Sequence, residues 1–176
     1  MLKSNLIFIF LILISCENSQ ENIANFVNEG DMPFKEVLEP EIMITQNGDL
    51  KLSISSNVMH KFDNGNTYFY GDVVIHFYKG AQVSTSLNCN EIMLDELKNM
   101  MTAKGSVLLF NDSQSLSTEE LFLDRTESLI YSDAYVSVIT ENKDTINADQ
   151  FRSNLDFTNP RFIGVNRSTI NNFPEF

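Results

Sequence analysis

Cysteine is scarce in this chain, which has two in 176 residues, Cys16 and Cys89. Two cysteines cannot supply the framework of disulfides that holds many small secreted domains together. Basic residues are also few, with 12 lysines and arginines against 24 aspartates and glutamates. The formal net charge of −12 argues against nucleic acid as a partner and against electrostatic binding to anionic lipid headgroups. Any contact with lipid must therefore depend mainly on apolar side chains.

Motifs of catalysis and metal binding are missing as well. The chain has no glycine-rich phosphate loop, no nucleophile elbow, no CxxC and no HExxH. His60 and His76 stand alone on predicted strands, which favours surface histidines over metal ligands. The neighbouring acids Glu119 and Glu120 should point to opposite faces of a strand, so they do not predict a catalytic pair. We expect no catalytic residue, no metal, no cofactor and no enzymatic activity.

Residues 1–15 predict a secretion signal. Lys3 precedes an apolar run from Leu6 to Ile14, which is too short for a typical transmembrane helix. The segment ends in Leu13, Ile14, Ser15 and Cys16, which resembles the lipobox of bacterial lipoproteins, in which cleavage precedes a diacylated cysteine. Loss of Lys3 with the signal would bring the formal charge to about −13. We predict that Cys16 is the lipid anchor; an ordinary signal peptide or an uncleaved anchor is the alternative.

The pattern after Cys16 predicts a tether over residues 16–39, a domain over 40–165 and a tail over 166–176. Ordered strands should begin near Ile42, where Asn47 and Gly48 mark the turn of a hairpin. A further turn is predicted at residues 63–66, and a last pair of strands over 157–165 around Pro160. Cys89 is expected to be a buried, unreactive thiol.

Alternation of apolar and polar residues dominates the rest of the chain. From Met101 to Leu109 every second residue is small or apolar, the period of a strand with one buried face. After a turn at residues 111–113, the inward parity shifts by one between Thr118 and Leu121, which suggests a bulge or a corner of the sheet. Gly105, like Gly71 and Ala134, is expected to face an opposite wall.

The same unit returns at intervals of about 29 residues. Leu87 precedes Leu116 by 29 positions, and Gly105 precedes Ala134 by 29. Such a period is typical of stacked supersecondary units, none of which can bury its apolar face without a neighbour. The sequence therefore predicts an all-β protein built from repeats.

These units, GSVLLFNDSQSLSTEELFLD and AYVSVITENKDTINADQF, together with GDVVIHFY and IYSD, resemble the LptC family of lipopolysaccharide-export proteins and the related LptA and OstA-like domains. The resemblance covers residues 40–165. It implies one open, twisted antiparallel β jelly roll with an apolar trough. The side chains expected to line the trough are Phe69, Val73, Ile75, Phe77, Met101, Val107, Leu109, Leu121, Leu123, Val136 and Val138.

The resemblance also implies partners. The protein would take lipopolysaccharide from an inner-membrane ABC transporter through its early strands, at residues 42–54, and pass it to an LptA-like protein through its last strands, at 157–165. The lipid anchor would hold it on the periplasmic face of the inner membrane rather than on the outer membrane. The alternative is an envelope lipoprotein with a structural or adaptor role, whose alternating residues only fill a core.

Overall fold

The computed structural model describes residues 32–170, which form one antiparallel sheet of 12 strands without a helix. The predicted all-β fold is thus confirmed. Among the described residues no helix has the length and apolar character needed to cross a membrane. The strands are β1 Lys35–Leu38, β2 Glu41–Gln46, β3 Asp49–Ser55, β4 Val58–Lys61, β5 Asn66–Lys79, β6 Gln82–Asp95, β7 Met100–Phe110, β8 Ser115–Asp124, β9 Leu129–Ser132, β10 Val136–Ile139, β11 Thr145–Asn154 and β12 Arg161–Thr169.

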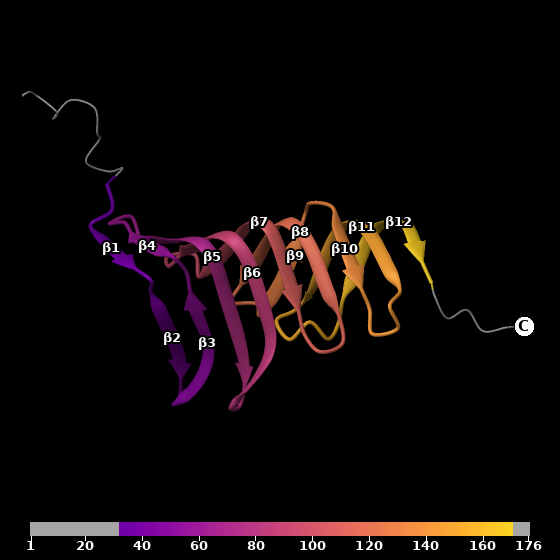
Figure 1. Cartoon of the computed structure of the whole chain (residues 1–176), viewed down its shortest axis with the longest axis horizontal. Helices are drawn as coiled ribbons and strands as arrows, with labels where there is room; N and C mark the ends of the chain where they lie inside the picture. The colour runs from indigo at the N-terminus through magenta and orange to yellow at the C-terminus, as the bar shows by residue number, and fades with distance from the viewer. Residues whose placement is uncertain (1–31, 171–176) are drawn as a thin grey trace, which may run out of the picture. The chain divides into compact units, whose positions relative to one another are not determined.

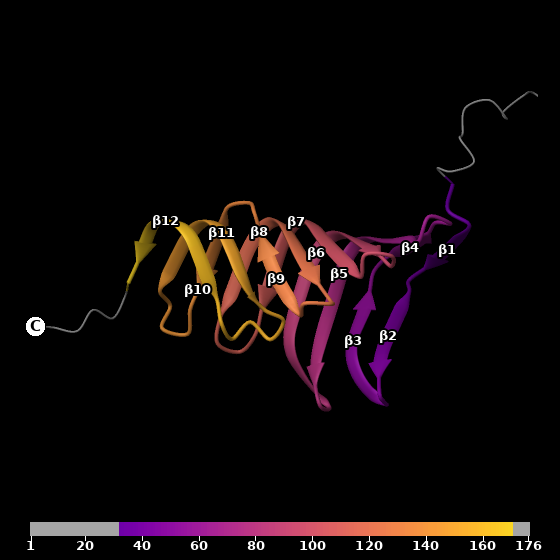
Figure 2. The same cartoon turned by 180° about the vertical axis from the view of Figure 1, so that it is seen from behind.

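The sheet is folded on itself, because its long strands change neighbours halfway along. The first half of β5 pairs with β4 and the second half with β3. Likewise β8 and β11 each pair with β10 over one half and with β9 over the other. We call wall A the part of the sheet that contains β1, β4 and β9, together with the halves of the long strands on their side of the fold. Wall B is the part that contains β2, β3 and β10, together with the other halves of the long strands. The sheet runs from β1 and β2 at one end to β12 at the other (Figure 1), and β9 lies on the side seen in Figure 2.

The sheet turns from one wall to the other at β-bulges in β5 and β7. In β5, Gly71 and Asp72 lie between the pairs Tyr70 with Glu91 and Val73 with Cys89, so two residues oppose one on β6. In β7, Gly105 and Ser106 lie between the pairs Lys104 with Glu120 and Val107 with Thr118, so two residues oppose one on β8. Both glycines have a positive φ, 72° and 74°, which glycine adopts without steric cost. A bulge of this kind bends its strand and increases its twist, so it turns the chain from wall A to wall B. The predicted parity shift is confirmed as this bend.

The core lies between the two walls. Its largest fully buried side chains include Phe69, Met101 and Leu121 on wall A and Ile75 and Leu109 on wall B. Each such side chain contributes roughly 1.5 to 3 kcal/mol by leaving water. The bend therefore allows the apolar faces of the two halves of each strand to bury one another.

The strands extend beyond the predicted limits of the domain. β1 lies within the predicted tether and pairs with β4, while β12 continues to Thr169, past the predicted end of the domain at residue 165. Phe157 is not in a strand but in the turn between β11 and β12, with its ring fully buried against Phe151. The predicted hairpin at Asn47 and Gly48 is confirmed. Cys16, the signal segment, most of the tether and residues 171–176 lie outside the described residues.

Gly105 does not face the opposite wall as predicted, because it occupies the bend. A Cβ atom at Gly105 would lie 2.8 Å from Asn90 Nδ2 and 3.1 Å from Asn90 Cβ. Gly71 is in the same situation, with Asn57 Nδ2 at 2.6 Å. Ala134 lies in the connection between β9 and β10.

We predict that Gly105→Ala lowers the free energy of unfolding by about 2 to 3 kcal/mol. About 1 kcal/mol comes from the left-handed backbone, and the remainder from contact with Asn90. Gly80→Ala is the matched control, because Gly80 has a φ of 65° with nothing within 4 Å of the added Cβ. Urea denaturation of the two variants measures the difference. Equal losses would show that Asn90 does not restrict the bend, whereas partial recovery in Gly105→Ala with Asn90→Ala would support the contact.

Candidate functional site

The predicted trough residues lie together between the walls. Phe77 is partly buried and packs against the core, while each of the other predicted positions is at most 1% exposed. These side chains pack against one another, so most of them touch protein alone. The exceptions are at the open side of the fold, where Phe77, Met101 and Leu123 also line a pocket.

This pocket has a volume of about 490 Å³ and lies between the two walls. Wall B contributes Ile44, Leu52 and Phe77 from β2, β3 and β5, and wall A contributes Met101 and Leu123 from β7 and β8. Leu155, which follows β11, completes the apolar lining. The volume is in the range that holds small-molecule ligands and cofactors.

The pocket exists because wall B extends further here than wall A. β5 contributes residues 73–79 to wall B and 66–70 to wall A, and β6 contributes 82–89 to wall B and 91–95 to wall A. The hairpins β2–β3 and β5–β6 reach the lowest points of the sheet in Figure 1. Leu52 pairs with Ile44 on one side and with Phe77 on the other. Three neighbouring strands thus present an apolar row beyond the end of the opposite wall.

Basic side chains outnumber acidic ones around the pocket. Lys51, Lys79 and Arg125 line it together with Asp156. Lys51 Nζ lies 3.4 Å from Asp49 Oδ2, and both side chains are well exposed, so this pair contributes little. Over residues 32–170, no carboxylate forms an ion pair with Lys79 or Arg125.

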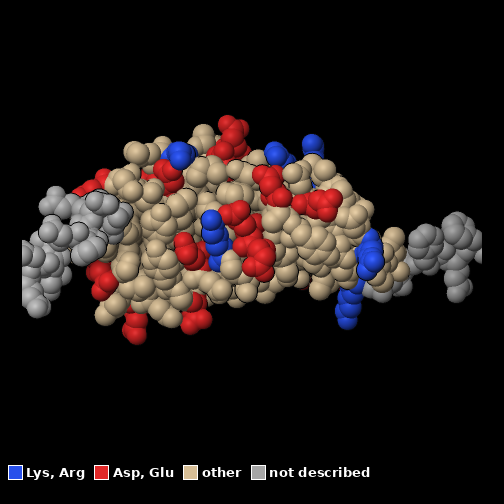
Figure 3. All heavy atoms as spheres, turned by 90° about the horizontal axis from the view of Figure 1, so that it is seen from above, with Lys and Arg blue, Asp and Glu red and all other residues tan. Residues whose placement is uncertain are grey.

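The opposite side of the fold, at the bend, has the reverse charge. Figure 3 looks down on the molecule from above, and acidic side chains are spread over this face. Asp72 and Glu119 are exposed at the bend, and Glu91 and Glu120 lie beside it. Lys104 Nζ is 3.1 Å from Glu120 Oε1. Glu119 and Glu120 are therefore solvated or paired with lysine rather than joined in a catalytic pair.

The other titratable groups do not converge on a site. His60 Nε2 is 2.8 Å from Glu36 Oε2, and His76 Nδ1 is 2.9 Å from Ser86 Oγ. Hydrogen bonds from the backbone and side chain of Lys98 to Asp95 help to close the β6–β7 turn, and they lower the pKa of Asp95. Within residues 32–170, no three of the His, Cys, Asp and Glu side chains are arranged to hold a metal ion.

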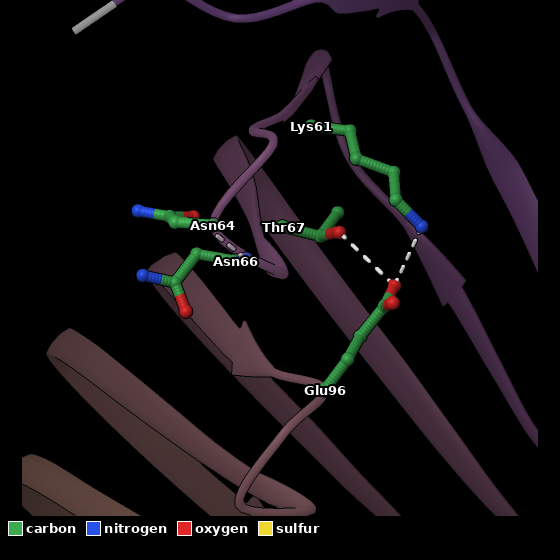
Figure 4. A network of polar contacts seen from close by, with 5 residues as sticks. All are labelled: Lys61, Asn64, Asn66, Thr67 and Glu96. Atoms are coloured by element: carbon green, nitrogen blue, oxygen red, sulfur yellow. Dashed lines mark hydrogen bonds and ion pairs between the residues drawn. The ribbon is translucent and has the colours of Figure 1, made fainter. Parts of the chain in front are cut away.

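A network around Glu96 joins two turns at the end of wall A. Lys61 Nζ donates a hydrogen bond to Glu96 Oε1 at 2.7 Å, and Thr67 Oγ1 approaches the same oxygen at 3.5 Å (Figure 4). Asn64 Oδ1 accepts a hydrogen bond from the backbone of Asn66 in the adjoining turn. These contacts link the β4–β5 turn to the end of β6, so the network has a structural role.

Unpaired edges occur at both ends of the sheet. β12 pairs with β11 alone, and it exposes Ile163 and Val165 by 52% and 56%. At the other end β2 pairs with β3 alone and exposes Met43 by 61%. Edge strands with exposed apolar side chains are places where another strand can be added.

The basic residues of the pocket were missed by sequence reasoning. Lys79 ends a strand and Arg125 lies in a turn, positions at which a charged residue is ordinary. The available signal was the length of the alternating segments 66–79 and 82–95, which are longer than the two that follow. That difference indicates one projecting hairpin, but the sequence does not show which turns lie opposite it.

A family model described as lipopolysaccharide-assembly, LptC-related, matches residues 40–167. No curated protein matches the chain significantly. Among solved structures, LptH of Pseudomonas aeruginosa, the LptA homologous periplasmic component of its lipopolysaccharide transport device, is similar in fold. The TM-score is 0.51 at 16% sequence identity, over 63% of this chain and 80% of that one.

The reactivity of the Cys89 thiol tests whether the two walls stay closed near the bend. Burial raises its pKa to about 12 from 9.0, so at pH 8 the folded protein should react with a disulfide reagent about a thousandfold more slowly than an exposed thiol. The unfolded chain should react rapidly. Because the unfolded thiol ionises first as the pH rises, this shift should also reduce stability between pH 9 and 12. Rapid labelling of the folded protein would show that the walls separate near Cys89.

Proposed function

Because the chain belongs to the LptC-related family of lipopolysaccharide-assembly proteins, we propose that it carries lipopolysaccharide across the periplasm. In this proposal it receives the lipid from an inner-membrane ABC transporter and passes it to an LptA-like protein. The observation that supports carriage is the apolar interior between two walls, together with the pocket that opens into it. Transport of this kind needs no catalytic group, since the ligand leaves unchanged.

Entry of acyl chains would begin at the pocket. Phe77 is only partly buried there, and Met101 and Leu123 adjoin it from the opposite wall. The strands that cross the bend connect the walls, and no strand pair of the described residues joins their free ends. Separation of those ends would replace contacts between side chains by contacts with acyl chains. Each methylene group that leaves water contributes about 0.8 kcal/mol, which offsets the packing lost when the walls part.

The two edges of the sheet would bind the partners. β12 would pair with the LptA-like protein, and β2 with the transporter, because these strands have unsatisfied backbone groups and lie at opposite ends of the strand order. The lipid anchor at Cys16 would keep the protein on the periplasmic face of the inner membrane, with the outer membrane as the less favoured location. The negative charge of the protein does not prevent this anchoring, because the acyl chains bind the membrane through apolar contacts.

An adaptor role is the second candidate, and one observation favours it. Most of the predicted trough is at most 1% exposed, as expected of an ordinary core that holds no ligand. An adaptor would use the edge strands alone and would keep its walls closed.

Site-specific photocrosslinking separates the two functions. A benzophenone amino acid at Phe77 or Met101 should capture lipopolysaccharide in cells, and at Leu109, Leu121 or Val138 it should capture less, because these positions are further inside. The controls are Lys104 and Ser137, outside the core. Carriage is supported by lipid adducts at the inward positions only. Absence of adducts from every position, with partner binding through the edges intact, would instead support the adaptor.

The anchor has its own test. Cys16→Ala should abolish incorporation of a labelled fatty acid and leave the protein unprocessed or misplaced, because the thiol is the predicted site of acylation. Cys89→Ala is the matched control and should leave labelling unchanged. If the unaltered protein takes up no label, the segment before Cys16 is an ordinary signal or an uncleaved anchor.

A further inference from the structure

The charge around the pocket is unusual for this chain. Acidic residues outnumber basic ones twofold in the sequence, yet three of the four charged residues that line the pocket are basic. Some lysines elsewhere are paired with carboxylates, as Lys61 is with Glu96 and Lys104 with Glu120, although Lys35 has no such pair within the described part of the chain. Lys79 and Arg125 have no such partner among residues 32–170. The positive charge therefore faces solvent without internal compensation.

These two cations come from opposite walls. Lys79 ends β5 on wall B, and Arg125 follows β8 on wall A. The same pocket is lined by Leu52, Phe77 and Met101, the apolar residues that adjoin the core. Asp156, the acid of the pocket, already accepts a hydrogen bond from Thr158 Oγ1 at 2.8 Å. A ligand that fits this arrangement has an apolar part and at least one anionic group at its polar end.

We propose that the pocket binds the phosphorylated end of an acylated ligand, an inference that rests on the proposed function. Acyl chains lie on Leu52, Phe77 and Met101, while Lys79 and Arg125 bind phosphate from the two walls. A guanidinium group can bind phosphate oxygens through two parallel hydrogen bonds, and lysine adds a point charge. The phosphate stays at the solvent-exposed rim, so its desolvation cost is small.

The placement of charge sets the orientation of the ligand. Acidic side chains are spread over the face at the bend (Figure 3) and would repel phosphate. Lys79 and Arg125 follow the ends of β5 and β8 that lie away from the bend. A phosphorylated lipid therefore enters with its acyl chains toward the bend and its polar end outward. Lys79 on wall B and Arg125 on wall A would both approach one phosphate as the pocket closes around it.

The test measures binding of the full chain, in detergent micelles, to two lipids that differ only in phosphate. Bisphosphorylated lipid A and its dephosphorylated form are the probes, and their ratio of affinities is the readout. The unaltered protein should prefer the phosphorylated lipid, and Lys79→Gln with Arg125→Gln should reduce that preference by about tenfold. Affinity for the dephosphorylated lipid should stay the same, because the apolar lining is unchanged.

The matched control is Lys35→Gln with Arg161→Gln. It removes the same two charges, and neither residue lines the pocket or has an ion pair among residues 32–170. This control should keep the preference for the phosphorylated lipid. An equal loss in both double variants would overturn the proposal in favour of a nonspecific charge effect. Thermal unfolding of each variant confirms that the exposed substitutions leave the fold intact.

The remaining outcomes separate this inference from carriage itself. If the unaltered protein binds both lipids equally, carriage stands and phosphate recognition at the pocket is wrong. If it binds neither lipid, both proposals fail. Inorganic phosphate is the third probe: binding of phosphate alone, with the same loss in Lys79→Gln and Arg125→Gln but no binding of lipid A, would overturn the acyl part and show a free phosphate site.

Discussion

The bend in each long strand is the feature on which the rest of the fold depends. A flat strand of 14 residues would be about 46 Å long and would leave one entire apolar face in water. The bulges at Gly71 and Gly105 turn the two halves toward each other, and the same face becomes the lining of both walls. Asn57 and Asn90 fill the space beside these glycines, which therefore cannot be replaced without strain. The interior follows from local backbone geometry repeated along the sheet.

The sequence predicts most of this interior because alternation is a local property. Just beyond the bend, Val73 pairs with Cys89, and Thr118 pairs with both Val107 and Val136. Val136 in turn pairs with Ala148, as the places of these residues in the repeat suggest. The role of Gly105 was misassigned, since alternation alone does not distinguish a small inward residue from a glycine in a bulge. β1 was missed because residues 35–38 are mostly exposed and have no apolar alternation.

The pocket could not be predicted in the same way, since it depends on differences between units. Two repeats of equal strand length would close against each other, whereas the longer β5 and β6 extend beyond β7 and β8. Lys79 and Arg125 are 46 positions apart on different walls, and nothing in either local sequence indicates the other. When residues line one pocket only because the fold brings them together, no local sequence pattern connects them. The resemblance to a family supplied the function that periodicity alone could not.

A carrier and an ordinary β protein differ in how firmly the two walls are held together. Here every strand pair lies along the sheet, so the contact across the interior is mainly side-chain packing. At the free ends of the walls, Gln114 Nε2 also donates a hydrogen bond to the carbonyl oxygen of Phe157. Packing of this kind is nondirectional, and an acyl chain can replace an aliphatic side chain as a neighbour with little change in contact energy. In the proposed function, backbone hydrogen bonds would hold each wall as a unit while the walls part. The sheet ends at β12, which pairs with both halves of β11, and at the other end at β1 on wall A and β2 on wall B. A strand added to β12 would therefore extend both walls, whereas one added to β2 would extend wall B. In the proposed function, the direction of transfer then depends on which edge is paired, because the interior itself has no chemical gradient along it.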